Sequence, residues 1–215
     1  MIQEDRSSAK FLPMPTPSTE LHSYGLTEYI RDLEALHDRC AAMPVKVREV
    51  STLTHRLAGS RGWLQPQFRQ PNKDSYARYL LHRDRLNRFV VLSLVWLPGQ
   101  ATPIHDHSCW GVMGMVAGEL TVVNYDRLDD GSRPGYAELQ EADTEVARPG
   151  VVSHVLPPYR ELHWIGNRGS EVAISLHIYG RDLDEVNVYD LVTHRVSRMR
   201  IKYYNLDWGN PDFVI

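Results

Sequence analysis

The stretch PGQATPIHDHSCWGVMG, Pro98–Gly114, places two histidines two positions apart, between a Pro-Gly turn and an apolar run broken by glycines. Alternate side chains of a β-strand point to the same face, so we expect His105 and His107 to project together and Asp106 to point away. Imidazole pairs at this spacing suit a borderline divalent metal ion. Two ordinary surface or core histidines would give the same short pattern, so the rest of the chain has to decide between these interpretations.

Outward from this stretch, the chain from about residue 74 consists of short segments rich in Val, Ile, Leu or Tyr, such as RFVVLSLVWLPG and EVAISLHIYG. Each segment is bounded by Gly, Pro, Asn or Asp, and this spacing predicts an all-β sandwich or barrel. Before it, GLTEYIRDLEALHDRCAAM carries apolar residues at three- and four-residue steps, which predicts an amphipathic helix with Thr27 as its N-cap. The next stretch, VREVSTLTHRLA, fits either a second short helix or an irregular segment.

The domain organisation that follows is simple. Residues 1–20 are polar and contain prolines, and we expect them to form a loose N-terminal arm. Residues 21–215 are expected to form a single domain, in which a helical N-terminal region packs on a β-barrel.

The composition of the 215 residues narrows the function classes. A formal net charge of −3 does not suggest a nucleic-acid-binding surface. The longest apolar run, FVVLSLVWL, is too short to span a bilayer, and the N-terminus does not resemble a secretory signal. Two cysteines form no disulfide framework, so we expect a reducing cytoplasm. The oligomeric state cannot be read from the sequence.

A second stretch, PPYRELHWIGN, complements the first. The two spacings together resemble the paired motifs of the cupin barrels, in which the first motif supplies two histidine ligands and the second supplies another. The resemblance makes His163 the expected third ligand, with His154 as a rival. Many cupins add a glutamate four residues after the second histidine, but that position is Gly111 here. The expected site therefore contains three histidines and no carboxylate.

Two further patterns bear on chemistry. In AISLHIYG, Ser175, His177 and Tyr179 alternate along one strand and would face one way, as a hydrogen-bonded row that ends in a phenol. The row begins twelve residues after the third histidine, so a single hairpin would bring both to one cavity. In YARYL, Tyr76 and Arg78 share a strand face, and arginine binds a planar carboxylate through a bidentate fork. Taken singly, an ordinary half-buried strand and a solvated arginine explain these patterns equally well.

Together, PIHDHSCWGVMG, LPPYRELHWIGN and AISLHIYG resemble the thiol dioxygenases of the cysteine dioxygenase family, in their bacterial form, over about Tyr76–Gly180. The resemblance implies a mainly β cupin fold (a double-stranded β-helix or jelly-roll barrel) with N-terminal helices. It also implies a mononuclear non-haem Fe(II) and the oxidation of a thiol to a sulfinic acid by O2. The residues that it assigns are His105, His107 and His163 to iron, Ser175, His177 and Tyr179 to the relay, and Tyr76 and Arg78 to the substrate carboxylate.

One departure from the family pattern is informative. In animal members, a cysteine on the first motif is crosslinked to the relay tyrosine. The matching position here is Gly111, as in bacterial members, and Cys109 lies two residues earlier. We therefore expect no thioether between Cys109 and Tyr179.

The family also suggests the substrate. Cysteine oxidisers use the arginine of the early Tyr-x-Arg strand, whereas 3-mercaptopropionate oxidisers carry glutamine there and use an arginine several residues beyond the relay tyrosine. Arg78 therefore favours L-cysteine, and Arg181 lies too close behind Tyr179 for the second role. A second arginine nearby would instead suit a dicarboxylic thiol such as mercaptosuccinate. A metal-dependent cupin of another chemistry, or a non-enzymatic ligand-binding cupin, remains an alternative at this stage.

Overall fold

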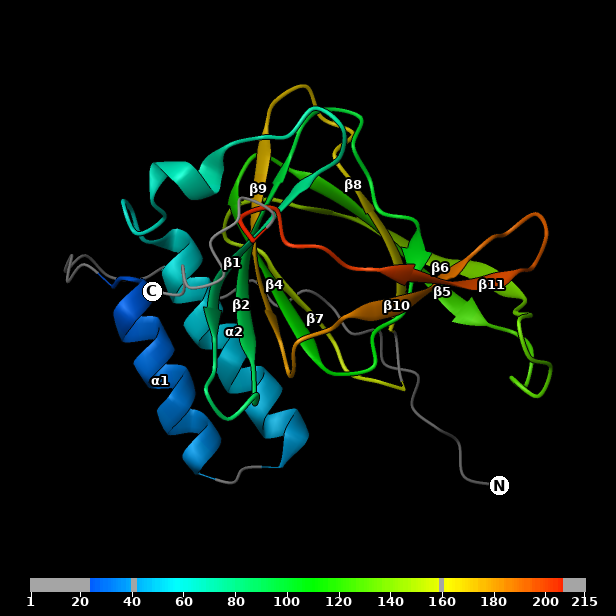
Figure 1. The fold of residues 1–215 in the computed structure, drawn as a ribbon, viewed down its shortest axis with the longest axis horizontal. Coiled ribbons are helices and arrows are strands. Elements are labelled where there is room, and N and C mark those ends of the chain that lie inside the picture. The colour runs from blue at the N-terminus through cyan, green and yellow to red at the C-terminus, as the bar shows by residue number, and fades with distance from the viewer. Residues whose placement is uncertain (1–23, 40–41, 159–160, 207–215) are drawn as a thin grey trace.

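The computed structural model describes residues 24–39, 42–158 and 161–206. This region contains two antiparallel β-sheets, and two α-helices cover the outer face of one of them (Figure 1). The prediction of a mainly β protein with N-terminal helices is confirmed. The expected N-terminal arm lies outside the described residues, so the division into an arm and one domain stays a prediction.

The helices precede the sheets in the chain. Helix α1 (Leu26–Asp38) begins one residue earlier than the expected cap at Thr27, because the backbone N–H of Gly25 donates to the Glu28 carboxylate at 3.1 Å. Helix α2 (Met43–Gly59) resolves the segment that the sequence left open, and a proline in its first turn needs no intrahelical acceptor for a backbone N–H. A short 3₁₀ helix, η1 (Pro66–Arg69), follows.

The first sheet has five strands, and the second has six. The order in the first is β1 (Ala77–Arg83), β2 (Val90–Trp96), β9 (Ala173–Tyr179), β4 (Gly111–Ala117) and β7 (Val152–Val155). The order in the second is β11 (Val196–Arg200), β10 (Glu185–Tyr189), β3 (Ile104–His105), β8 (Leu162–Gly166), β5 (Leu120–Arg127) and β6 (Leu139–Ala147).

The five-stranded sheet is buried on both faces, which explains the continuous apolar runs of β2 and β9. In β2, Val91 and Val95 pack toward the helices, whereas Leu92, Leu94 and Trp96 pack toward the second sheet. Strand β9 alternates in the same way: its aliphatic residues at 174, 176 and 178 face the helices. The inner face of β9 therefore carries its polar row into the space between the sheets.

The β1–β2 turn is held by a buried carboxylate. Asp84 accepts from two nitrogens of the Arg88 guanidinium, at 2.9 and 2.8 Å, and from two backbone N–H groups of the turn. We call Asp84 with Arg88 the hairpin ion pair. Arg88 also donates to Asp38 at the end of α1, which ties the hairpin to the helix. None of the helices in the described part of the chain is both long and apolar enough to cross a membrane.

Candidate metal centre

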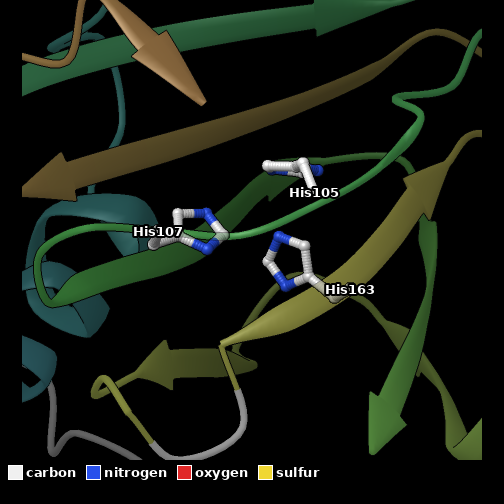
Figure 2. Close-up of side chains that lie close together, drawn as sticks. All are labelled: His105, His107 and His163. Atoms are coloured by element: carbon white, nitrogen blue, oxygen red, sulfur yellow. The ribbon is translucent and has the colours of Figure 1, made fainter. Parts of the chain in front are cut away.

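Three histidine side chains meet between the sheets. Figure 2 shows the imidazoles of His105, His107 and His163 facing a common space, the first two from one segment and the third from β8. One ring nitrogen of each lies within 4.8 Å of one ring nitrogen of every other. The three rings are buried, with centroids 4.7–4.8 Å apart.

Hydrogen bonds to the backbone orient two of the rings. Nδ1 of His105 lies 3.0 Å from the carbonyl oxygen of Pro103, and Nδ1 of His107 lies 2.9 Å from that of Glu161. A carbonyl oxygen only accepts, so each Nδ1 carries the proton and each Nε2 keeps its lone pair. Nε2 of His163 is buried and has no hydrogen-bond partner within the described residues. This arrangement is typical of imidazoles that ligate a metal ion.

Burial also keeps these rings neutral. Desolvation, followed by the neighbouring His107, lowers the pKa of His105 to about 3. Desolvation likewise lowers the pKa of His107 and, together with the two neighbouring imidazoles, lowers that of His163 well below its usual value. Neutral imidazole is the form that binds a metal ion. The three residues therefore fit a divalent metal with three nitrogen ligands and open positions.

The reason for the convergence differs from the expected one. Strand β3 contains only Ile104 and His105, and His105 lies opposite His163 in the pairing of β3 with β8. His107 lies beyond the strand, so strand alternation does not place it. The hydrogen bond to Glu161 turns its ring toward the other two.

The rival ligand and the carboxylate lie elsewhere. His154 is exposed on β7, in the other sheet, and does not belong to the cluster of three histidines. Glu119, the acidic residue after the first motif, pairs with Arg148 at 2.9 Å. Within the described residues, the cluster contains no carboxylate.

A cavity opens beside the histidines and encloses about 300 Å³, part of it open to solvent. Its polar lining comprises Tyr76, Arg78, Thr102, His105, His107 and Tyr179. Nε of Arg78 is buried and has no hydrogen-bond partner within the described part of the chain. A guanidinium beside a cavity can bind an anionic group, and a carboxylate matches its geometry.

The polar row of β9 forms a continuous hydrogen-bonded chain. Oγ of Ser175 lies 2.8 Å from Nε2 of His177, and Nδ1 of His177 lies 3.1 Å from the hydroxyl of Tyr179. The indole N–H of Trp96 donates to Oγ of Ser175 at 3.0 Å. All four side chains are buried, and Tyr179 reaches the cavity.

The proton positions along this row depend on which way the Ser175 hydroxyl donates. Trp96 occupies an acceptor position of Ser175, and the only other described partner of that hydroxyl is His177. If the Ser175 hydroxyl donates to Nε2 of His177, then Nδ1–H of His177 donates to the Tyr179 oxygen. The Tyr179 hydroxyl can then donate to a group in the cavity. Burial, followed by the Arg78 charge, lowers the pKa of His177 to about 3, which keeps the imidazole neutral. Burial raises the pKa of Tyr179 to about 12, which keeps the phenol protonated.

A single hairpin does not connect the histidine cluster to this row, contrary to expectation. His163 lies on β8 in the six-stranded sheet, whereas Ser175 lies on β9 in the five-stranded sheet. The chain crosses from one sheet to the other, so the two groups face each other across the barrel interior.

Sequence reasoning missed Trp96 and assigned no role to Asp106. The ring of Tyr76 stacks on that of Trp96, with centroids 4.3 Å apart and planes 17° apart, so Trp96 supports both the relay and a cavity wall. Asp106 points away from the histidines, and its carboxylate accepts from Asn187 and Tyr189 of β10. The alternation of residues along β2 could have placed Trp96 on the inward face. No local pattern in the sequence could have paired Asp106 with β10.

Gly111, the position that matches the crosslinked cysteine of animal members, lies beside the ring of Tyr179. A Cβ on Gly111 would lie 2.9 Å from a ring carbon of Tyr179, so the missing side chain makes room for this ring. Cys109 is a free thiol, and burial raises its pKa. The absence of a Cys109–Tyr179 thioether stays a prediction.

The chain was compared with solved structures and with protein families. Solved structures that resemble the chain include TT1209 from Thermus thermophilus (19% identity, TM-score 0.41, 54% of this chain and 91% of that one). An RmlC-like cupin protein from Desulfovibrio desulfuricans matches with 18% identity and a TM-score of 0.37, over 52% of this chain and 87% of that one. A cupin superfamily protein from Desulfitobacterium hafniense matches with 13% identity and a TM-score of 0.39, over 53% and 84%.

The predicted cupin fold is confirmed, and the three-histidine cluster lies inside its barrel. The family model described as cysteine dioxygenase type I matches residues 21–192, which include every residue of the cluster and of the relay. The chain therefore belongs to the cysteine dioxygenase type I family.

Proposed function

We propose that this protein oxidises L-cysteine with O2 to cysteine sulfinic acid at a mononuclear Fe(II) bound by His105, His107 and His163. Family membership supports thiol dioxygenase activity in general. The three neutral imidazoles supply the metal site, and the cavity beside them has the size of a small molecule. Few cysteines support a cytoplasmic location.

The observation that carries the choice of substrate is Arg78. Arg78 lines the same cavity as two of the histidines and Tyr179, and its buried Nε has no hydrogen-bond partner among the described residues. A substrate with a carboxylate at one end and a thiol at the other would place the thiol toward the histidines when the carboxylate binds Arg78. L-Cysteine has this form.

The protein's own groups then have distinct tasks. Arg78 binds and orients the carboxylate, and Tyr76, held by stacking on Trp96, closes the cavity beside it. Tyr179, with its proton directed by His177, donates a hydrogen bond into the cavity, where it stabilises oxygen atoms that gain negative charge. The relay keeps that donor at a fixed position.

Fe(II) held by His105, His107 and His163 would supply open ligand positions and the redox chemistry that joins a thiol with O2. The overall reaction is balanced, since the thiol RSH and O2 give RSO2H. Sulfur loses four electrons, and the two oxygen atoms gain them. No further reductant is needed.

The position of Arg181 separates the candidate thiols. Its side chain is exposed, and its guanidinium donates to the hydroxyl of Ser108 rather than lining the cavity. Among the residues that the structure describes, Arg78 is the only arginine that lines the cavity, and this favours a monocarboxylic thiol over mercaptosuccinate.

O2 uptake tests the proposal. Iron-loaded protein is given L-cysteine, 3-mercaptopropionate or mercaptosuccinate separately, and the sulfinate is identified by mass spectrometry. We expect uptake and sulfinate with L-cysteine, and a large rise in KM without loss of iron in Arg78→Ala. Preference for 3-mercaptopropionate would retain the reaction and overturn the substrate. No uptake with any thiol, despite bound iron, would overturn the activity itself.

A further inference from the structure

The C-terminal segment, residues 201–206, returns from β11 to the edge strand β1, and the ribbon in Figure 1 follows this path. In the structure, the Tyr204 N–H donates to the carbonyl of Arg78 at 2.7 Å. Asn205 exchanges two hydrogen bonds with the backbone of Leu80, at 3.0 and 2.9 Å. We call residues 201–206 the C-terminal strap; it is fastened to the strand that carries Arg78.

The strap brings one aromatic ring under the proposed carboxylate-binding group. The guanidinium carbon of Arg78 lies 5.4 Å from the ring centroid of Tyr203, within the range of a cation–π contact. Tyr203 is buried, with 9% of its surface exposed, so the contact is shielded from water. Among the described residues, Arg78 has no carboxylate partner, which leaves Tyr203 as its main lateral support.

The hydroxyl end of this ring is fixed as well. Tyr203 donates to one carboxylate oxygen of Asp182, and the other oxygen accepts from Nη2 and Nε of Arg83 at 2.5 and 2.8 Å. Arg83 belongs to the same strand as Arg78, and Asp182 lies three residues after Tyr179.

We propose that Tyr203 is a positioning residue for substrate recognition: its ring, anchored through Asp182 and Arg83, holds the Arg78 guanidinium at the cavity, where it binds the substrate carboxylate. Arginine has many rotamers, and fixing them before binding removes part of the entropic cost of binding. This inference rests on the proposed function, in which Arg78 binds the carboxylate. It implies that Tyr203 affects only thiols that carry a carboxylate.

Anaerobic calorimetric titration of the iron-loaded, full-length protein tests this. The two ligands are L-cysteine and cysteamine, which has the same thiol and amine but no carboxylate. We expect Tyr203→Leu to raise the Kd of L-cysteine about tenfold and to change that of cysteamine by less than about twofold. Tyr203→Phe keeps the ring but loses the hydrogen bond to Asp182, and it disturbs the packing less than Tyr203→Leu. We expect it to raise the Kd of L-cysteine about threefold and to leave that of cysteamine unchanged.

Tyr204→Leu is the matched control. Tyr204 is the adjacent strap residue, but its ring packs edge-on against Tyr79 on the other side of β1, with centroids 5.6 Å apart. We expect its Kd for L-cysteine to stay within about twofold of wild type. In an Arg78→Ala background, Tyr203→Leu is expected to cause no further loss, because the two residues act through one contact.

Four results would overturn the inference: an equal loss for cysteamine in Tyr203→Leu, unchanged L-cysteine binding in both Tyr203 variants, an equal loss in Tyr204→Leu, or additive losses with Arg78→Ala. The failure of the proposed function has a different signature. If wild-type protein binds L-cysteine without forming sulfinate, the proposed reaction is overturned, and a loss of L-cysteine binding specific to Tyr203→Leu still supports the positioning role. Wild-type protein that binds L-cysteine no more tightly than cysteamine overturns both.

Discussion

The Asp106→Asn substitution tests how the protein aligns two of its histidines. Asp106 lies between them, immediately after a β3 strand of two residues. Its carboxylate accepts from the backbone N–H of Asn187 at 2.9 Å, from the side-chain amide of Asn187 at 2.7 Å, and from the hydroxyl of Tyr189 at 2.9 Å. These bonds fasten the end of β3 to β10.

Asparagine at this position keeps one acceptor oxygen and presents an NH2 group to the remaining donors. At least one of the three hydrogen bonds is lost, and bonds to a charged acceptor contribute about 1.5–3 kcal/mol each. We therefore expect Asp106→Asn to lower the free energy of unfolding by about 2–4 kcal/mol. Because a histidine flanks it on each side, we also expect metal affinity to fall about 10- to 100-fold, the usual effect of losing a group that orients ligands.

Urea unfolding of the metal-free protein measures the first effect, and Fe(II) titration against a competing chelator measures the second. Tyr189→Phe removes a single bond and should give a smaller loss of both. Asp190→Asn is the matched control, because Asp190 accepts from the backbone N–H groups of Val192 and Thr193 in an exposed turn away from the cluster. If Asp106→Asn loses stability but binds Fe(II) with wild-type affinity, the anchor does not orient the ligands and the reasoning is refuted.

Three other sets of substitutions test the metal ligands, the relay and the stability of the fold separately. His163→Ala should lose bound iron and remain folded, while His154→Ala should retain iron; metal analysis of both proteins decides, and full iron loading of the former would contradict the ligand assignment. Gly111→Ala places a methyl carbon 2.9 Å from the Tyr179 ring, so we expect a loss of about 1–3 kcal/mol from overpacking together with slower sulfinate formation; an unchanged melting temperature and rate would show that the ring is not confined. The hairpin ion pair lowers the pKa of Asp84 from 3.8 to about 2. A carboxyl with a depressed folded pKa stabilises the fold above its unfolded pKa, so about 2 kcal/mol is present above pH ~4 and disappears as the pH falls toward ~2. Asp84→Asn should remove this part of the pH dependence of the free energy of unfolding, measured by urea titration. If the variant loses as much stability as wild type between pH ~4 and ~2, the prediction is wrong.

Local patterns were sufficient for the fold class. Short apolar runs bounded by turn residues indicate strands wherever they occur, because strand formation depends on alternation and chain reversal within a few residues. Helix α1 followed from its three- and four-residue periodicity. Helix α2 did not, because β-branched residues such as Val50 and Thr54 give the same segment some strand character until its apolar face packs on β4.

The candidate site divides in the same way. The spacing His-x-His, the third histidine and the Ser-x-His-x-Tyr row were visible in the sequence, since each is a short motif on one segment. How the motifs meet was not visible, because β8 and β9 lie in different sheets and His107 is oriented by the carbonyl of Glu161 rather than by strand alternation. Long-range pairing chooses among many arrangements that local preferences leave equal.

By itself, then, the sequence determined a mainly β barrel, its N-terminal helix and the residue types of a three-histidine site. Only the tertiary structure decided that Trp96 donates to Ser175 of the relay, that Asp106 fastens β3 to β10, and that Tyr203 contacts the Arg78 guanidinium. The physical reason is distance along the chain. The strap contacts a strand 125 residues earlier in its bonds to Leu80, and no local periodicity encodes a contact of that separation.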